Sequence, residues 1–255
     1  METIDLCIVR SLDGSDVALL PYIPYLLQDI WEIGSSADHL CRLIEKNDLT
    51  HRIKKGLDLG CGKGAISITM AKRFGWTMHG IDAMSDFIDE AKQRAETLKI
   101  NSRVSFEVAD LRLRLRTLGE YDLIILGSIG PVLGTIQETL SAVRPSLNQP
   151  GYVLLDDGYA KEDEASYDVY PYHAQVLEQI EKAGFILIDE YIYDYSTIRE
   201  SNEYIYKAIE KRAGELSEQF PAKQHLFQDY LDIQRRENRV LEEEIVCATW
   251  LLSYQ

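Results

Sequence analysis

The sequence has few cysteines, and none of them forms a recognisable pair. Cys7, Cys41, Cys61 and Cys247 are scattered along 255 residues, and no C-x-x-C spacing occurs. This pattern indicates neither a zinc site nor a disulfide framework. We therefore expect no metal centre and assign no chemistry to these thiols.

Basic residues are also scarce relative to acidic ones. The chain carries 27 Lys and Arg against 42 Asp and Glu, a formal net charge of −15. Proteins that bind nucleic acid neutralise phosphates with Lys and Arg, and this chain lacks that general attraction. One basic cluster exists, at Arg112, Arg114 and Arg116, and we interpret it as a solvated charged face. A local nucleic-acid footprint is the minority alternative, so we predict no nucleic-acid partner.

Long apolar runs are missing as well. No stretch reaches the length of a membrane span, and the opening residues, METIDLCIVRSLDG, lack the basic-then-apolar pattern of a secretory signal. These absences predict a cytoplasmic protein without a membrane partner. The hydrophobic fraction of 45% is ample for a packed core.

The stretch GLDLGCGKGAISITMAKRFGWTMHGID, residues 56–82, predicts a β-α-β unit with a glycine-rich turn. A buried strand is followed by apolar residues at near-helical spacing, and Gly75 ends the helix. The expected elements are a strand at 57–59, a turn with glycines at 60, 62 and 64, a helix at about 63–74, and a strand at about 77–81.

The chemistry of this turn favours a nucleoside ligand. Gly60, Gly62 and Gly64 remove Cβ atoms where a ligand touches the backbone, and the helix that follows directs its first N–H groups to the same place. Asp82 ends the second strand, where a carboxylate can accept both hydroxyls of a ribose.

Two ligand classes use such a layout. Gly60, Gly62 and Ala65 loosely satisfy the G-x-G-x-x-G/A pattern of dinucleotide sites. However, Asp58 precedes the glycines, and a carboxylate there suits an ammonium group better than a pyrophosphate. With its G-x-G-x-G spacing, LDLGCGKG resembles motif I of the class I S-adenosylmethionine (SAM)-dependent methyltransferases.

This resemblance implies a fold and a domain division. The fold is α/β: a Rossmann-like, doubly wound, seven-stranded, mostly parallel sheet whose last strand is antiparallel. We expect residues 1–50 to form an N-terminal helical cap and residues 51–255 the SAM-binding domain. The other expected helices are at about 37–45, 85–98, 134–143 and 172–183, and the other strands at about 104–110, 121–126, 152–156, 185–193 and 245–252.

The resemblance also implies the donor site. Asp58 and the glycine loop would hold the methionine end, Asp82 the ribose, and Asp110 the adenine amino group, with Leu111 over the adenine face. Asp110 could instead simply cap the next segment. The predicted cofactor-binding set is Asp58, Gly60, Cys61, Gly62, Gly64, Asp82, Ala83, Ala109, Asp110, Leu111 and Gly127.

The acceptor site is much less defined. Asp157 and Tyr159 follow the fifth strand, His173 begins the next helix, and Tyr22 and Tyr25 lie in the cap, so these are the candidate catalytic residues. Ordinary packing is the alternative for each. No Asn/Asp-Pro-Pro-Tyr motif follows the fourth strand, which argues against the exocyclic amines of DNA as acceptors. An acidic loop is expected at about 160–170.

The final strand is delayed by an insertion. Residues at about 197–244 predict two helices, one at 203–218 and one at 223–243, which form a lid or a homodimer surface. Tyrosines near this segment form either an aromatic pocket wall or a stripe in a helical core. They are Tyr191, Tyr193, Tyr195, Tyr204 and Tyr206.

Together these features predict a SAM-dependent methyltransferase that acts on a small molecule and releases S-adenosylhomocysteine (SAH). The alternatives are a SAM-binding sensor or assembly protein without catalysis and, less favoured, an NAD-dependent oxidoreductase. The sequence identifies neither the acceptor atom nor a general base.

Overall fold

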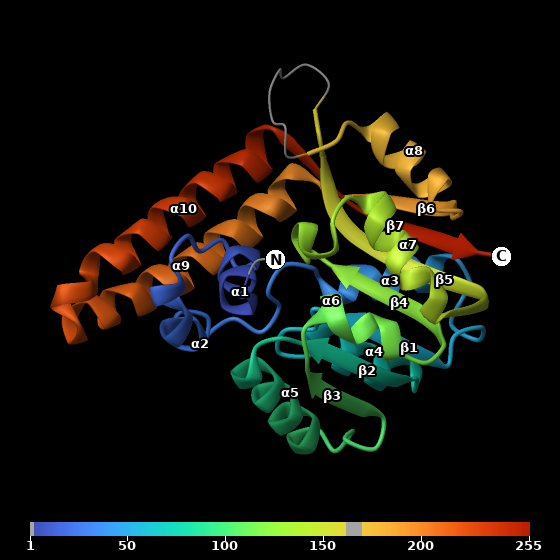
Figure 1. The fold of residues 1–255 in the computed structure, drawn as a ribbon, viewed down its shortest axis with the longest axis horizontal. Coiled ribbons are helices and arrows are strands. Elements are labelled where there is room, and N and C mark those ends of the chain that lie inside the picture. The colour runs from blue at the N-terminus through green and yellow to red at the C-terminus, as the bar shows by residue number, and fades with distance from the viewer. Residues whose placement is uncertain (1–2, 162–169) are drawn as a thin grey trace.

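The computed structural model describes residues 3–161 and 170–255, which leaves most of the expected acidic loop at 160–170 outside the described residues. A seven-stranded sheet forms the centre, in the order β3-β2-β1-β4-β5-β7-β6 (Figure 1). Pairing is parallel from β3 to β5, and β7 runs antiparallel between β5 and β6. The predicted fold class is therefore confirmed. The strands are β1 Lys55–Leu59, β2 Thr77–Asp82, β3 Val104–Val108, β4 Tyr121–Gly127, β5 Leu147–Ala160, β6 Ile186–Ile192 and β7 Ile245–Tyr254.

Helices cover both faces of this sheet. The α-helices are α1 Ile4–Ser11, α2 Ile23–Leu26, α3 Ala37–Lys46, α4 Ala65–Phe74, α5 Ser85–Thr97, α6 Leu111–Arg114, α7 Ile136–Val143, α8 His173–Lys182, α9 Tyr195–Gln219 and α10 Gln224–Glu243. Short 3₁₀ turns are η1 Val17–Tyr22, η2 Leu115–Thr117, η3 Gly130–Leu133, η4 Arg144–Ser146 and η5 Pro221–Lys223. Residues of α3, α4 and α5 pack on one face of the sheet, and those of α6, α7 and α8 pack on the other.

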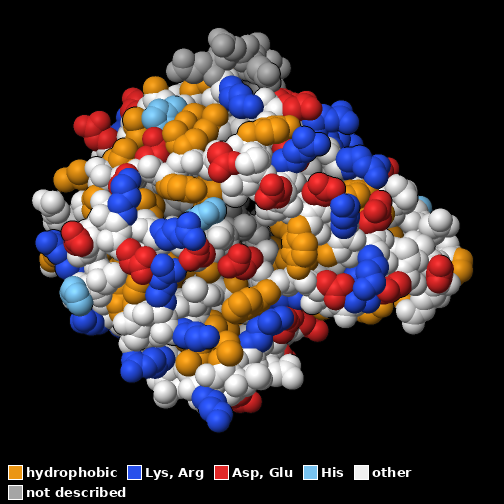
Figure 2. Space-filling view, turned by 180° about the vertical axis from the view of Figure 1, so that it is seen from behind, with side chains coloured by type: hydrophobic (Ala, Val, Ile, Leu, Met, Phe, Trp, Pro, Cys, Tyr) orange, Lys and Arg blue, Asp and Glu red, His pale blue; other side chains and the backbone are white. Residues whose placement is uncertain are grey.

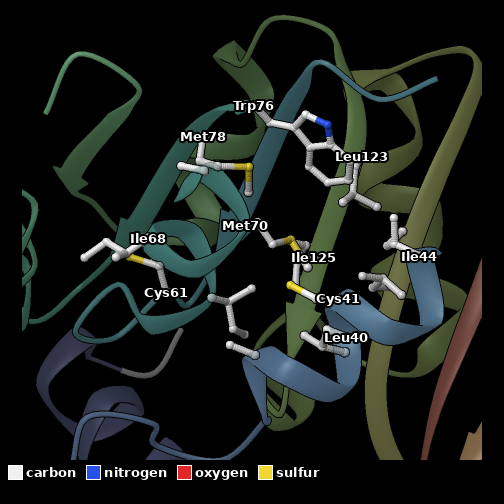
Figure 3. Close-up of a cluster of buried hydrophobic side chains, with 14 of the residues drawn as sticks. Leu40, Cys41, Ile44, Cys61, Ile68, Met70, Trp76, Met78, Leu123 and Ile125 are labelled. Atoms are coloured by element: carbon white, nitrogen blue, oxygen red, sulfur yellow. The ribbon is translucent and has the colours of Figure 1, made fainter. Parts of the chain in front are cut away.

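The cluster on the first face also buries two of the cysteines. Figure 3 shows Cys41 and Cys61 among aliphatic side chains and the ring of Trp76. Burial raises the pKa of the Cys61 thiol well above its usual value. Cys61 therefore supports the glycine turn from below as a small apolar side chain.

A third apolar cluster joins the N-terminal segment to the insertion. Helices α9 and α10 form a long hairpin that extends away from the sheet, with α1 and α2 beside it (Figure 1). The ring of Tyr22 makes edge contacts with Phe220 and Phe227, at centroid distances of 5.5 and 5.1 Å. Residues from both ends of the chain thus share one core.

Three differences between the predicted and the observed elements bear on the site and the insertion. Strand β5 extends to Ala160 instead of ending near residue 156, because β7 pairs with it from Gly151 to Ala160. Helix α9 starts at Tyr195, since Asp194 caps it by accepting a hydrogen bond from the Thr197 N–H. Helix α1 lies in a stretch from which the sequence indicated no element.

The surface carries charges of both signs. Figure 2 shows acidic and basic side chains interspersed over one face of the molecule. None of the helices in the described part of the chain is long and apolar enough to cross a membrane.

Candidate functional site

A pocket opens where the chain reverses its winding direction between β1 and β4. It encloses about 770 Å³, including its open mouth, and parallel α/β sheets bind ligands at this kind of switch point. The pocket is lined by Ile4, Cys7, Ile8, Ser11, Leu12, Ile33, Gly60, Gly62, Asp82, Ala83, Met84, Phe87, Asp110, Leu111, Arg112, Gly127, Ser128, Ile129 and Val132.

The glycine turn forms the floor of this pocket. Gly60 and Gly62 have φ values of +72° and +50°, which L side chains rarely adopt. A Cβ on Gly60 would also lie 2.6 Å from Cγ2 of Ile129. The turn therefore needs glycine for its conformation and leaves bare backbone facing the pocket.

Asp82 fixes the turn in place. Its two carboxylate oxygens accept hydrogen bonds from the N–H of Gly62 at 2.9 Å and of Met84 at 2.8 Å. Burial raises the pKa of Asp82, and these backbone donors partly offset that effect. Each carboxylate oxygen keeps acceptor capacity for a ligand hydroxyl, because it can accept more than one hydrogen bond.

Asp110 lines the pocket and also caps α6. It accepts the Arg112 N–H at 3.0 Å, so the capping alternative is realised. The Arg112 guanidinium forms a fork with the same carboxylate, with Nη2 at 2.7 Å from Oδ2, and this lowers the pKa of Asp110.

The structure gathers part of the predicted cofactor-binding set around the pocket. The residues that line it are Gly60, Gly62, Asp82, Ala83, Asp110, Leu111 and Gly127. Asp58 is buried beneath the turn, where its Oδ2 accepts the Ser67 hydroxyl at 2.8 Å. Gly64 caps α4 against the ring of Phe106, and the remaining members, Cys61 and Ala109, pack in the two sheet cores.

The candidate catalytic residues do not line this pocket. His173 bonds Glu190 at 2.8 Å and packs on the ring of Tyr159, while the Asp157 carboxylate accepts the N–H of Gly158. Tyr25 donates to Glu215 on α9. With Tyr22 in the hairpin core, these five side chains have structural partners.

Sequence reasoning missed the helix that covers the pocket. Ile4, Cys7, Ile8 and Ser11 of α1 line it, together with Leu12. Their i, i+3, i+4, i+7 spacing is the signature of an amphipathic helix, and Thr3 caps it through the Leu6 N–H. This pattern could have located the cover.

A polar network runs from the pocket wall at the end of β4 to a buried carboxylate. Ser128 has φ +54°, unusual for a residue other than glycine, and its hydroxyl lies 3.1 Å from that of Ser35. The Ser35 hydroxyl also faces the buried carboxylate of Asp156 and lowers its pKa, and this carboxylate accepts the Tyr193 hydroxyl at 2.9 Å. Asp156 thus has hydroxyl partners from two segments that are far apart in sequence, Ser35 and Tyr193.

Metal ligands do not cluster at this site. Within residues 3–161 and 170–255, no group of three or more His, Cys, Asp and Glu side chains is arranged to hold a metal ion.

Comparison with known proteins identifies the family. Residues 51–220 match the model of the methyltransferase domain family. The chain therefore belongs to this family, which confirms the methyltransferase class predicted from the glycine turn.

Solved structures share the fold along nearly the whole chain. A SAM-dependent methyltransferase from Geobacter sulfurreducens in complex with SAH is 17% identical, with a TM-score of 0.75 over 92% of this chain and 98% of that one. One from Thiobacillus denitrificans, also with SAH, is 18% identical, with a TM-score of 0.73 over 91% and 98% of the two chains. YjhP from Escherichia coli is 19% identical, with a TM-score of 0.74 over 91% of this chain and all of that one.

A stretch of 58 residues has higher sequence identity to a known protein than the full-length structural matches have. The uncharacterized protein YjhP of Escherichia coli K12 is 47% identical over 58 residues, which are 22% of this chain and 23% of that protein. This match spans less than a quarter of the relative's length.

Proposed function

We propose that this methyltransferase binds SAM in the pocket above the glycine turn and methylates a small-molecule acceptor. The observation that carries this proposal is the convergence of a bare-backbone turn with Asp82 and Asp110 at neighbouring strand ends. The structures with bound SAH support the same donor, since they share the fold.

The pocket residues fit the donor's separate parts. Asp82 can accept the ribose hydroxyls, and Asp110 the adenine amino group beside Leu111. The ammonium end would lie over Gly60 and Gly62, which line the pocket without side chains. Asp58 contributes from below, because it anchors the start of α4 through Ser67.

The protein's main contribution to catalysis is position. The bound donor supplies an electrophilic methyl group. Holding the acceptor in line with that group can contribute on the order of 7–11 kcal/mol. The aliphatic side chains of α1 and the segment after β4 form the wall that would hold an apolar acceptor.

Calorimetry with SAH, SAM and NAD tests this donor assignment. We expect micromolar binding of SAM and SAH and none of NAD. The Asp82→Ala variant should weaken SAH binding by about 1.5–3 kcal/mol, since hydrogen bonds to a charged group are lost. Asp89→Ala, on the exposed side of α5, is the matched control. NAD binding, or an unchanged affinity in Asp82→Ala, would remove the assignment.

The insertion and the N-terminal segment keep their predicted roles as proposals. A cap formed by residues 1–50, and a homodimer through α9 and α10, rest on the sequence pattern. Light scattering of the purified protein measures the dimer directly.

A further inference from the structure

The buried carboxylate behind the pocket wall has no structural counter-charge. Asp156 is 6% exposed, and the side chains that bond it are hydroxyls: Ser35, Tyr193 and Thr249. A buried carboxylate normally has a cationic partner, because three neutral hydroxyls only partly replace its hydration. Burying the Asp156 carboxylate costs free energy of desolvation. Because it lies beside the pocket of an enzyme, this carboxylate is a candidate for a role in proton transfer.

The donors and acceptors of this network are ordered so that a proton can move from the pocket toward Asp156. An ionised carboxylate accepts only, so where the Ser35 hydroxyl faces Asp156 it must be the donor. The Ser35 oxygen must then accept from Ser128, 3.1 Å away. Ser128 is exposed and lines the pocket, so its oxygen keeps lone pairs for a ligand proton.

The backbone holds this path rigidly. Ser128 adopts φ +54° and its N–H donates to the Asp156 carbonyl at 2.9 Å. Gly34 approaches closely, since a Cβ there would lie 3.0 Å from that of Ser128. A positive φ at a residue other than glycine is strained. It persists where the surrounding structure holds the residue in place, as at functional sites.

The side chains around Ser128 indicate which class of acceptor the pocket fits. Around Ser128 the pocket wall is aliphatic, from Ile33, Ile129, Val132 and the α1 residues Ile8 and Leu12. Such a wall accepts an apolar body, and Ser128 offers one polar contact. A phenolic hydroxyl fits, because its proton must leave as the methyl group arrives and a carboxylate can assist that loss.

We propose that the acceptor is an apolar phenol, and that Ser128 passes its proton through Ser35 to Asp156. This inference rests on the proposed function. In the step, the phenol oxygen forms a bond to the methyl carbon, the bond from that carbon to sulfur breaks, and its electron pair stays on sulfur. Three protons shift by one position each: phenol to Ser128, Ser128 to Ser35, and Ser35 to Asp156.

The charge environment suits this role. Burial raises the pKa of Asp156 to about 6, and the nearby Asp157 carboxylate acts in the same direction, while the hydroxyl donors lower it. The other titratable groups that face it are Tyr193 and Cys247, whose pKa values are themselves raised by burial. His39 packs on the ring of Tyr193. Asp156 is therefore ionised at neutral pH and a stronger base than an exposed aspartate.

Methyl transfer from labelled SAM to 4-butylphenol and 4-butylaniline tests the acceptor class. The neutral aniline attacks before it loses a proton, so it needs no base in the transfer step. We expect transfer to the phenol, with a rate that falls below about pH 6 as Asp156 becomes protonated. In Asp156→Asn this rate should drop by about 10²–10⁴-fold and lose its dependence on pH in that range. Ser146→Ala, a buried serine in η4, is the matched control and should behave as wild type.

A spectroscopic readout tests the path without turnover. The titration of the protonated-carboxyl infrared band should lose one component in Asp156→Asn, while buried carboxyls such as Asp58, whose pKa is also raised by burial, keep theirs. Ser35→Ala should shift that titration to higher pH, because a donor to the carboxylate is lost. Ser35→Ala and Ser128→Ala should also slow phenol methylation, and Ser35→Ala, which lies behind the pocket lining, should do so without changing SAH affinity.

The outcomes separate the two proposals. Failure of the wild-type protein to bind SAH would overturn the proposed function. Normal SAH binding without phenol methylation, or with equal transfer to the aniline, would overturn the acceptor class. Phenol methylation that Asp156→Asn and Ser35→Ala leave unchanged would overturn the proton path.

Discussion

Asp58 shows how a predicted site residue can lie beneath the pocket without lining it. It precedes the glycine turn, as the resemblance requires, yet its side chain faces Ser67 at the start of α4 and not the pocket. The sequence located Asp82 and Asp110 at the pocket because each follows a parallel strand, and strand ends meet at one edge of the sheet. The side-chain direction of Asp58 depends on packing beneath the turn, which no local pattern encodes.

The burial of Asp58 has a measurable effect on stability. Burial raises its pKa from 3.8 to about 6, so the folded state binds a proton more tightly than the unfolded state. The unfolding free energy of wild type should therefore fall as pH rises from about 4 to about 6, and level off above. Relative to Asp58→Asn, we expect a loss on the order of 2–3 kcal/mol between these limits.

Denaturant unfolding at pH 4.5 and 7.5 measures this difference. Comparing the two pH values cancels any constant effect of the amide on packing. Asp86→Asn, at an exposed position in α5, serves as the control. A wild-type-minus-variant difference that is the same at both pH values would contradict the expectation.

At the scale of elements, long-range packing decided what the sequence could not predict. Tyr22 and Tyr25 were expected over the acceptor, but their partners Phe220 and Glu215 lie in the insertion, about 190 residues later in the chain. The Ser128, Ser35 and Asp156 network likewise joins three segments that are far apart in sequence. By contrast, the strands and most helices followed from periodicity, because each buries one regular face.

Helix α1 should respond to the donor more than the hairpin does. It has eight residues and lines the pocket, so it can open locally at low cost, and a ligand that contacts it should hold it closed. Hydrogen exchange should therefore slow at the α1 amides when SAH binds. The amides of residues 213–219 at the far end of α9 provide the internal control. Equal protection of both segments, or none at α1, would exclude α1 as a cover.

The whole molecule carries a net charge of −15. This charge should affect the donor SAM and the product SAH differently, because the two ligands differ by one unit of charge. SAM bears a sulfonium and SAH a neutral thioether, so the long-range field favours the donor over the product. Salt screens this field, with a screening length of about 30 Å at 0.01 M and about 10 Å at 0.1 M. Raising the ionic strength should thus weaken SAM binding a few-fold more than SAH binding.

Parallel calorimetric titrations of SAM and SAH over this salt range give the comparison. SAH serves as the control for salt effects on the protein itself. Identical salt slopes for the two ligands would show that local contacts alone set the preference.

The antiparallel pairing of β6 with β7 also determines how the long hairpin is attached. Tyr193 N–H bonds the Cys247 carbonyl at 3.0 Å, so the chain leaves and re-enters the sheet at adjacent points. A segment with neighbouring ends can be shortened, lengthened or exchanged while the strands keep their register. None of the described residues that line the pocket belongs to α9 or α10, so such an exchange leaves the donor-binding half unaltered.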